Sequence, residues 1–162
     1  MTSIIIFSKN NKMKYVSSII KEKTYSDIIE IKDLERKSGF LGRFKNNYNA
    51  LRSNKTRIEP ETITLNDYDL ILIGSPSTFG SVSPAISTFI EKNTFKNKNV
   101  IIYTTTNSRQ GYEVLRQMKN KIEEKGGTIV NSFILRVNNK SDDEIKINTI
   151  KVIKELDLDL YT

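Results

Sequence analysis

The sequence contains neither cysteine nor histidine. Without thiols or imidazoles, the chain cannot form disulfides, thiolate metal sites, cysteine nucleophiles or histidine acid–base pairs. Any redox chemistry must therefore come from a bound cofactor. Long hydrophobic runs are also missing, because the apolar stretches are short blocks such as Ile4–Phe7 and Leu70–Ile73, which are far too short to span a bilayer. These blocks indicate buried strands, and we expect no membrane insertion.

The start of the chain has no targeting signal that we recognise. Only Thr2 and Ser3 stand between Met1 and the first apolar block, and neither a positively charged stretch nor a small-residue cleavage site follows. We therefore expect a cytoplasmic protein. The 162 residues contain no long linker and no low-complexity tract, so we expect one compact domain over residues 1–162.

Acidic side chains are outnumbered, with 19 Asp and Glu against 26 Lys and Arg, for a formal net charge of +7. Much of the excess lies between Lys32 and Arg57, where eight basic residues accompany two acidic ones. This segment is either a docking surface for an acidic partner or a solvated helix face. The positive charge is the only feature that supports nucleic-acid binding. We do not expect such binding, because few aromatic residues are interleaved with the basic ones.

Apolar blocks alternate with helical patterns along the chain. The predicted strands are Ile4–Phe7, Ile28–Ile31, Asp69–Gly74, Val100–Thr104 and Ile129–Val137. Helices are predicted around Met13–Ile20, Phe40–Leu51, Ile86–Ile90 and Leu115–Ile122, and from Ser141 onward with Ile147, Ile150 and Ile153 on the buried face. Strands that alternate with helices favour an α/β fold, a doubly wound parallel sheet of five strands between two helical layers.

Sheets of this kind bind ligands at the carboxyl ends of their strands, so three loops are candidate sites. The loop after the first strand consists of Ser8, Lys9, Asn10, Asn11, Lys12 and Met13. It leads straight into a helix, where unpaired backbone N–H groups and the positive end of the helix dipole favour a phosphate. Lys12 adds positive charge. The alternative is an ordinary polar turn between a strand and a helix.

The loop after the third strand consists of Ser75, Pro76, Ser77, Thr78, Phe79 and Gly80. Pro76 restricts the backbone and Gly80 frees it, so the loop can present Phe79 as a flat apolar wall on which a planar ring stacks. The alternative is that Phe79 plugs the core.

The loop after the fourth strand offers Thr105, Thr106, Asn107 and Tyr112. Its hydroxyl, amide and backbone N–H groups suit the polar edge of a heterocycle, and Tyr112 could cover a second face of the ring. The alternative is a polar loop that ends in a helix cap. Because all three loops end at the same edge of the predicted sheet, they favour a common binding site.

The segment Asp67–Pro76, followed by Gly80, Ser83 and Pro84, resembles the third strand and flavin-flanking loop of the flavodoxin family. A second similarity covers the long connection from Lys32 to Arg52, and the resemblance extends over essentially the whole chain. It implies the flavodoxin-like strand order 2-1-3-4-5 and non-covalently bound FMN as the cofactor.

The resemblance also implies roles for the three loops. Ser8–Met13 would hold the FMN phosphate, Ser75–Gly80 would flank the isoalloxazine ring, and Thr105–Tyr112 would hold its pyrimidine edge. Met13 departs from the family pattern, which usually has a hydroxyl residue there. Met13 cannot donate a side-chain hydrogen bond to the phosphate, and the loss of such a bond costs about 0.5 to 1.5 kcal/mol. We therefore expect a reduced affinity for FMN.

The function that the resemblance implies is low-potential electron transfer, in which a monomeric carrier without catalytic residues shuttles electrons between redox proteins, from a reductase donor to an acceptor enzyme. The alternative is an FMN-dependent NAD(P)H:quinone or flavin oxidoreductase on the same fold. The sequence contains no obvious nicotinamide site. A signalling receiver domain shares the strand order but needs an aspartate at the end of the third strand, where this chain has Gly74 and Ser75.

Overall fold

The structure is a computed structural model of the whole chain, and it describes residues 3–8, 10–35, 55–77, 79–107 and 109–158. The strands are β1 (Ser3–Ser8), β2 (Asp27–Asp33), β3 (Ile58–Glu59), β4 (Leu70–Pro76), β5 (Asn99–Thr106) and β6 (Thr128–Arg136). The helices are α1 (Asn11–Thr24), α2 (Pro84–Lys92), α3 (Gly111–Glu124) and α4 (Asp142–Glu155).

The strands form a single sheet in the order β3-β2-β1-β4-β5-β6. The five long strands run parallel, which confirms the predicted α/β fold. When these five strands are numbered along the chain without β3, their order is the predicted 2-1-3-4-5. The addition is β3, which pairs antiparallel with β2 through Ile58 and Glu59. Two residues give no alternating pattern, so sequence periodicity could not predict this strand.

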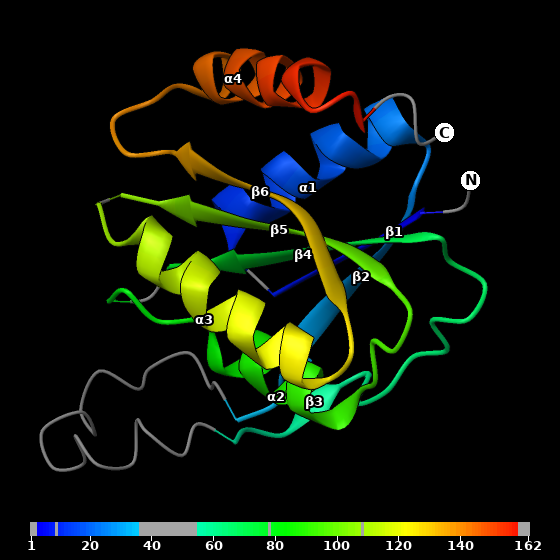
Figure 1. Cartoon of the computed structure of the whole chain (residues 1–162). Coiled ribbons are helices and arrows are strands. Elements are labelled where there is room, and N and C mark those ends of the chain that lie inside the picture. Colours follow the sequence, from blue (N-terminus) through cyan, green and yellow to red (C-terminus); the bar gives the residue numbers. More distant parts are fainter. Residues whose placement is uncertain (1–2, 9, 36–54, 78, 108, 159–162) are drawn as a thin grey trace, which may run out of the picture.

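Helices cover both faces of the sheet, with α1 and α4 on one side and α2 and α3 on the other (Figure 1). The central strands β1 and β4 are therefore buried at every position. Alternate residues serve opposite faces, so that Ile4 and Ile6 belong to the core beneath α2 and α3, while Ile5 and Phe7 belong to the core beneath α1 and α4. Burial on both faces explains why these strands are apolar at nearly every position.

The last helix begins as predicted, and two of the three residues predicted for its buried face contact the core, because Ile153 is buried and Ile150 is half-buried against it. Ser141 caps α4 in a capping box, because its Oγ accepts from the Glu144 amide and the Glu144 carboxylate accepts from the Ser141 amide. The prediction that Ile147 is buried is wrong, since its side chain is 66% exposed. The buried positions are Ile145, Thr149 and Ile153, and a residue two positions from Ile145 lies about 200° around the helix.

The predicted helix at Phe40–Leu51 lies outside the described residues. On either side of that stretch, the Leu34 amide donates to the Arg57 carbonyl, and the Thr56 hydroxyl donates to the Asp33 carboxylate at 2.6 Å. Among the residues that the structure describes, no helix combines the length and the apolar composition needed to cross a membrane.

Candidate functional site

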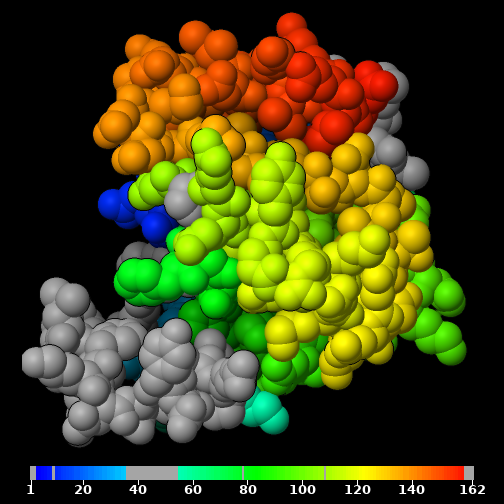
Figure 2. Space-filling view, turned by 60° about the vertical axis from the view of Figure 1, so that its left-hand side comes forward, coloured from blue at the N-terminus to red at the C-terminus, as the bar shows by residue number. Residues whose placement is uncertain are grey.

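The three loops chosen from the sequence meet at the carboxyl edge of the sheet, where they line one cavity of about 280 Å³. In Figure 2 the blue residues from the beginning of the chain lie close to the yellow-green residues that follow β5. The cavity is lined by Asn10, Lys12, Pro76, Ser77, Thr105, Thr106, Asn107, Val137 and Asn138. The last two follow β6 and were not predicted, because no residue in that turn stood out by its chemistry. Another depression, between α3 and β6, contains none of the predicted site residues.

The first loop already uses part of its hydrogen-bonding capacity. Asn10 is the N-cap of α1, and its Oδ1 accepts from the backbone amides of Lys12 at 3.0 Å and Met13 at 3.3 Å. Asn11 is exposed in the first turn, whereas the side chain of Met13 is fully buried in the core. Met13 can therefore contribute only its backbone to a ligand. Lys9 lies outside the described residues.

The Lys12 ammonium lies at the cavity and forms an ion pair with Asp142 at the start of α4, with Nζ and Oδ1 2.7 Å apart. The two residues are 130 positions apart in the chain. The positive charge of Lys12 was predicted from the sequence, but its partner was not, because only the packing of α1 against α4 brings the two helix N-termini together.

A group of three buried serines joins the first loop to the second. The hydroxyls of Ser8 and Ser83 are hydrogen-bonded at 2.7 Å, and the Ser83 amide donates to Ser75 Oγ at 2.9 Å. Ser83 Oγ also caps α2 by accepting from the Ile86 amide. Two hydroxyls that we predicted to be in the binding site, those of Ser8 and Ser75, thus hold the scaffold together beneath the cavity.

The second loop presents its aromatic residue to solvent. The Phe79 side chain is 95% exposed, so the alternative in which it plugs the core is excluded. Phe79 and Gly80 both have left-handed backbone conformations, with φ values of 51° and 75°. This backbone is unfavourable for Phe79 and readily adopted by Gly80. Thr78 lies outside the described residues.

Gln117 of α3 fixes the position of this loop. Its Nε2 donates to the Gly80 carbonyl, and its Oε1 accepts from the Val82 amide, both at 3.3 Å. The same Nε2 donates to Glu113, which also forms a bidentate pair with Arg116. The Arg116 guanidinium, followed by the Gln117 amide, lowers the pKa of Glu113 to about 2. Gln117 was not predicted, since an internal helix glutamine gives no sequence signal.

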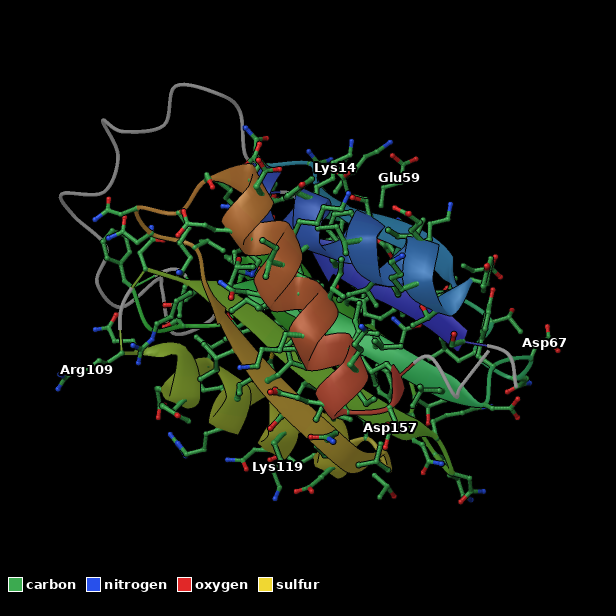
Figure 3. The ribbon with its side chains drawn as sticks, turned by 90° about the horizontal axis from the view of Figure 1, so that it is seen from above. Lys14, Glu59, Asp67, Arg109, Lys119 and Asp157 are labelled. Carbon is green, nitrogen blue, oxygen red and sulfur yellow. The ribbon has the colours of Figure 1, made fainter. Side chains whose placement is uncertain are left out.

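The third loop is bound to the second, because the Ser77 amide donates to the Thr105 carbonyl at 2.9 Å. Thr105 and Thr106 are buried at the end of β5, while Asn107 is exposed. Tyr112, in the first turn of α3, is 73% exposed. Arg109 extends from this loop into solvent (Figure 3).

The cavity lining suits a ligand that carries an anionic group together with polar hydrogen-bonding groups. The residues that line the cavity, as far as the structure describes them, carry hydroxyls, side-chain amides and one ammonium, and they include no carboxylate. Within the described ranges no cluster of carboxylates could hold a metal ion. The fold and the cavity thus define a doubly wound α/β protein with a ligand site at the carboxyl ends of parallel strands.

The chain belongs to the flavodoxin family. Residues 42–145, more than half of the chain, match the family model described as Flavodoxin. None of the curated proteins compared with the chain matches it.

Solved structures with the same fold come from several bacteria. A Lactobacillus acidophilus flavoprotein in complex with FMN is 21% identical, with a TM-score of 0.65, 82% of this chain and 92% of that chain covered. Oxidised flavodoxin 2 from Bacillus cereus is 15% identical, with a TM-score of 0.57 and coverage of 96% and 99%. General stress protein 14 from Treponema denticola, in complex with FMN, is 11% identical, with a TM-score of 0.63 and coverage of 98% and 99%. At these identities the similarity establishes the fold.

Proposed function

We propose that this protein binds FMN non-covalently in the cavity between the three loops and acts as a monomeric electron carrier in the cytoplasm. The observation that carries the proposal is Phe79, which is 95% exposed and lies only two residues beyond the cavity residue Ser77. Burying a Phe side chain contributes about 1.5 to 3 kcal/mol, and an exposed Phe in a loop forgoes this contribution. A flat ligand that covers the ring would recover part of it.

The residues present fit FMN from end to end. The positive end of the α1 dipole and the Lys12 ammonium suit a phosphate. Phe79 would stack on one face of the isoalloxazine ring, and Thr105, Thr106 and Asn107 would hydrogen-bond its polar edge. Two of the similar structures are complexes with FMN, which supports this choice among flat anionic ligands.

FMN would supply the redox chemistry, and this chain would bind it, orient it and limit its contact with water. Phe79 would shield one ring face while leaving an edge open toward a partner. The described lining of the cavity contains Lys12 as its only ionisable side chain. Because Lys12 is paired with Asp142 and no second ionisable group is found among the described lining residues, we favour a carrier over an oxidoreductase.

The partners we propose are redox proteins, a reductase that donates electrons and an enzyme that accepts them. Most of the basic segment between Lys32 and Arg57 lies outside the described residues, so a docking role for it with an acidic partner stays a prediction.

Turnover assays separate the carrier from the oxidoreductase. Protein loaded with FMN is mixed with NAD(P)H and a quinone, with and without a separate flavodoxin reductase. The carrier proposal predicts that NAD(P)H is oxidised steadily only when the reductase is present. Steady turnover by the purified protein alone would contradict it and favour the oxidoreductase.

A further inference from the structure

The Lys12–Asp142 ion pair lies at the phosphate end of the proposed FMN site. Lys12 lines the cavity from the first turn of α1, and its Nζ lies 2.7 Å from Asp142 Oδ1. The Lys12 and Asp142 side chains are 40% and 68% exposed. Both therefore remain accessible to solvent and to an incoming anion.

Of the two helix starts that meet here, only that of α4 carries acidic side chains. The first turn of α1 contains no acidic residue, whereas that of α4 contains Asp142, Asp143 and Glu144. Glu144 is engaged in the capping box with Ser141. Asp143 is exposed and makes no ion pair or hydrogen bond with the described residues. Asp142 is thus the one carboxylate of this turn that reaches the cation at the cavity.

A phosphate bound at the start of α1 needs the same ammonium. A flavin phosphate carries up to two negative charges, and it would meet an Asp142 carboxylate that already neutralises Lys12. Phosphate binding would then weaken the Lys12–Asp142 ion pair, while the Asp142 charge would repel the phosphate.

We propose that Asp142 competes with the FMN phosphate for Lys12 and thereby sets the affinity of this protein for FMN relative to flavins without a phosphate. The inference rests on the proposed FMN site and deepens it. Asp142 would act through Lys12 at the phosphate end of the site, so its effect should fall on the phosphate and not on the ring.

The test compares Asp142→Asn with the matched control Asp143→Asn, which removes the same charge from the same helix turn. FMN and riboflavin are titrated separately into each apoprotein at low ionic strength, where surface charges are least screened. Flavin fluorescence reports binding, and circular dichroism checks the fold. Asp142→Ala serves as a second variant in case the first is misfolded.

Asp142→Asn removes an exposed ion pair and one charge that repels the phosphate. We therefore expect it to tighten FMN binding about three- to tenfold. We expect a change of at most about twofold for Asp143→Asn, and riboflavin affinity unchanged within about twofold in both variants. In a Lys12→Gln background, Asp142→Asn should change the logarithm of the FMN affinity by less than half as much as in the wild type. The reason is that the ammonium for which Asp142 and the phosphate compete is then absent.

Three results overturn the inference. Equal effects of Asp142→Asn and Asp143→Asn would show general electrostatics, and equal tightening of FMN and riboflavin would show an effect on the ring. Weaker FMN binding by Asp142→Asn would show that the carboxylate positions Lys12 for the phosphate. In all three cases the wild-type protein still binds FMN and the proposed function stands. If the wild-type protein binds no FMN, both fail together.

Discussion

Replacing Ser83 by alanine tests whether the buried serines hold the loops of the site together. Ser83 Oγ is the only hydrogen-bond partner of Ser8 Oγ among the described residues, at 2.7 Å. It also caps α2 through the Ile86 amide, at a longer 3.4 Å. Both Ser8 and Ser83 are buried, at 3% and 2% exposure. The substitution therefore removes a cap and leaves a hydroxyl without a partner, away from water.

The magnitude follows from these two losses. Loss of a helix cap costs about 0.5 to 2 kcal/mol, and the long Ile86 distance places Ser83 near the lower end. A buried hydroxyl left unsatisfied costs about 1 to 3 kcal/mol. We expect Ser83→Ala to lower the free energy of unfolding by about 2 kcal/mol. Ser8→Ala should cost about 1 kcal/mol, because Ser83 Oγ still accepts from Ile86.

Urea unfolding of the apoprotein measures these changes. With a slope of about 2 kcal/mol/M, the unfolding midpoint of Ser83→Ala should fall by about 1 M. The double variant Ser8→Ala, Ser83→Ala should cost about 1 kcal/mol less than the sum of the single variants, because no orphaned hydroxyl remains. Additive single effects, or a Ser83→Ala cost below about 0.5 kcal/mol, would show that the Ser8 and Ser83 hydroxyls do not depend on each other. Ser8→Ala should also leave FMN affinity nearly unchanged, because its hydroxyl is already engaged.

Three further predictions concern the loops and their supports. Phe79→Ala should weaken FMN binding about tenfold and change the stability of the apoprotein by less than about 0.5 kcal/mol, since the ring is 95% exposed. Gly74→Ala should lower stability by about 2 to 3 kcal/mol in thermal unfolding, because a Cβ there would overlap the ring of Tyr103 and lie 2.7 Å from its hydroxyl. The Glu113 carboxyl should titrate near pH 2 in an NMR experiment. Its pKa is lowered on folding, so its contribution to stability is complete above the ordinary value of 4.5 and is lost as the pH falls through about 2.

Each of these predictions has a control. Phe79→Tyr keeps an aromatic ring and should retain most of the FMN affinity, so an equal loss in both variants would argue against stacking. Gly111→Ala should be milder than Gly74→Ala, because its Cβ would approach no described atom closer than 3.1 Å. Arg116→Gln should return the Glu113 pKa toward 4.5, and a wild-type midpoint already near that value would contradict the assigned ion pair.

The fold was predictable because its signals are local and repeated. The apolar run from Leu70 to Ile73 predicts a strand buried on both faces, and Ser141 followed by acidic residues predicts the start of a helix. The errors occurred where tertiary packing decides. Ile147 is as apolar as Ile145, and only the position of α4 on the sheet makes one exposed and the other buried. The pair of residues in β3 forms a strand only because β2 offers an edge.

The site was predictable as a set of loops but not as a set of contacts. The carboxyl ends of parallel strands had to meet, so the cavity followed from the topology. Which polar groups face that cavity depends on partners far away in the sequence. Ser8 is bound by Ser83, 75 residues later, and Lys12 is paired with Asp142. No spacing rule indicates either pair.

The proposed function requires one FMN site, in the cavity between the three loops. Fluorescence titration of FMN into the apoprotein, with the protein concentration well above the dissociation constant, tests it most directly. We expect quenching that saturates at one FMN per chain, with binding at micromolar concentrations and loss of affinity in Phe79→Ala. No binding at micromolar FMN, or saturable binding that Phe79→Ala leaves unchanged, would contradict it.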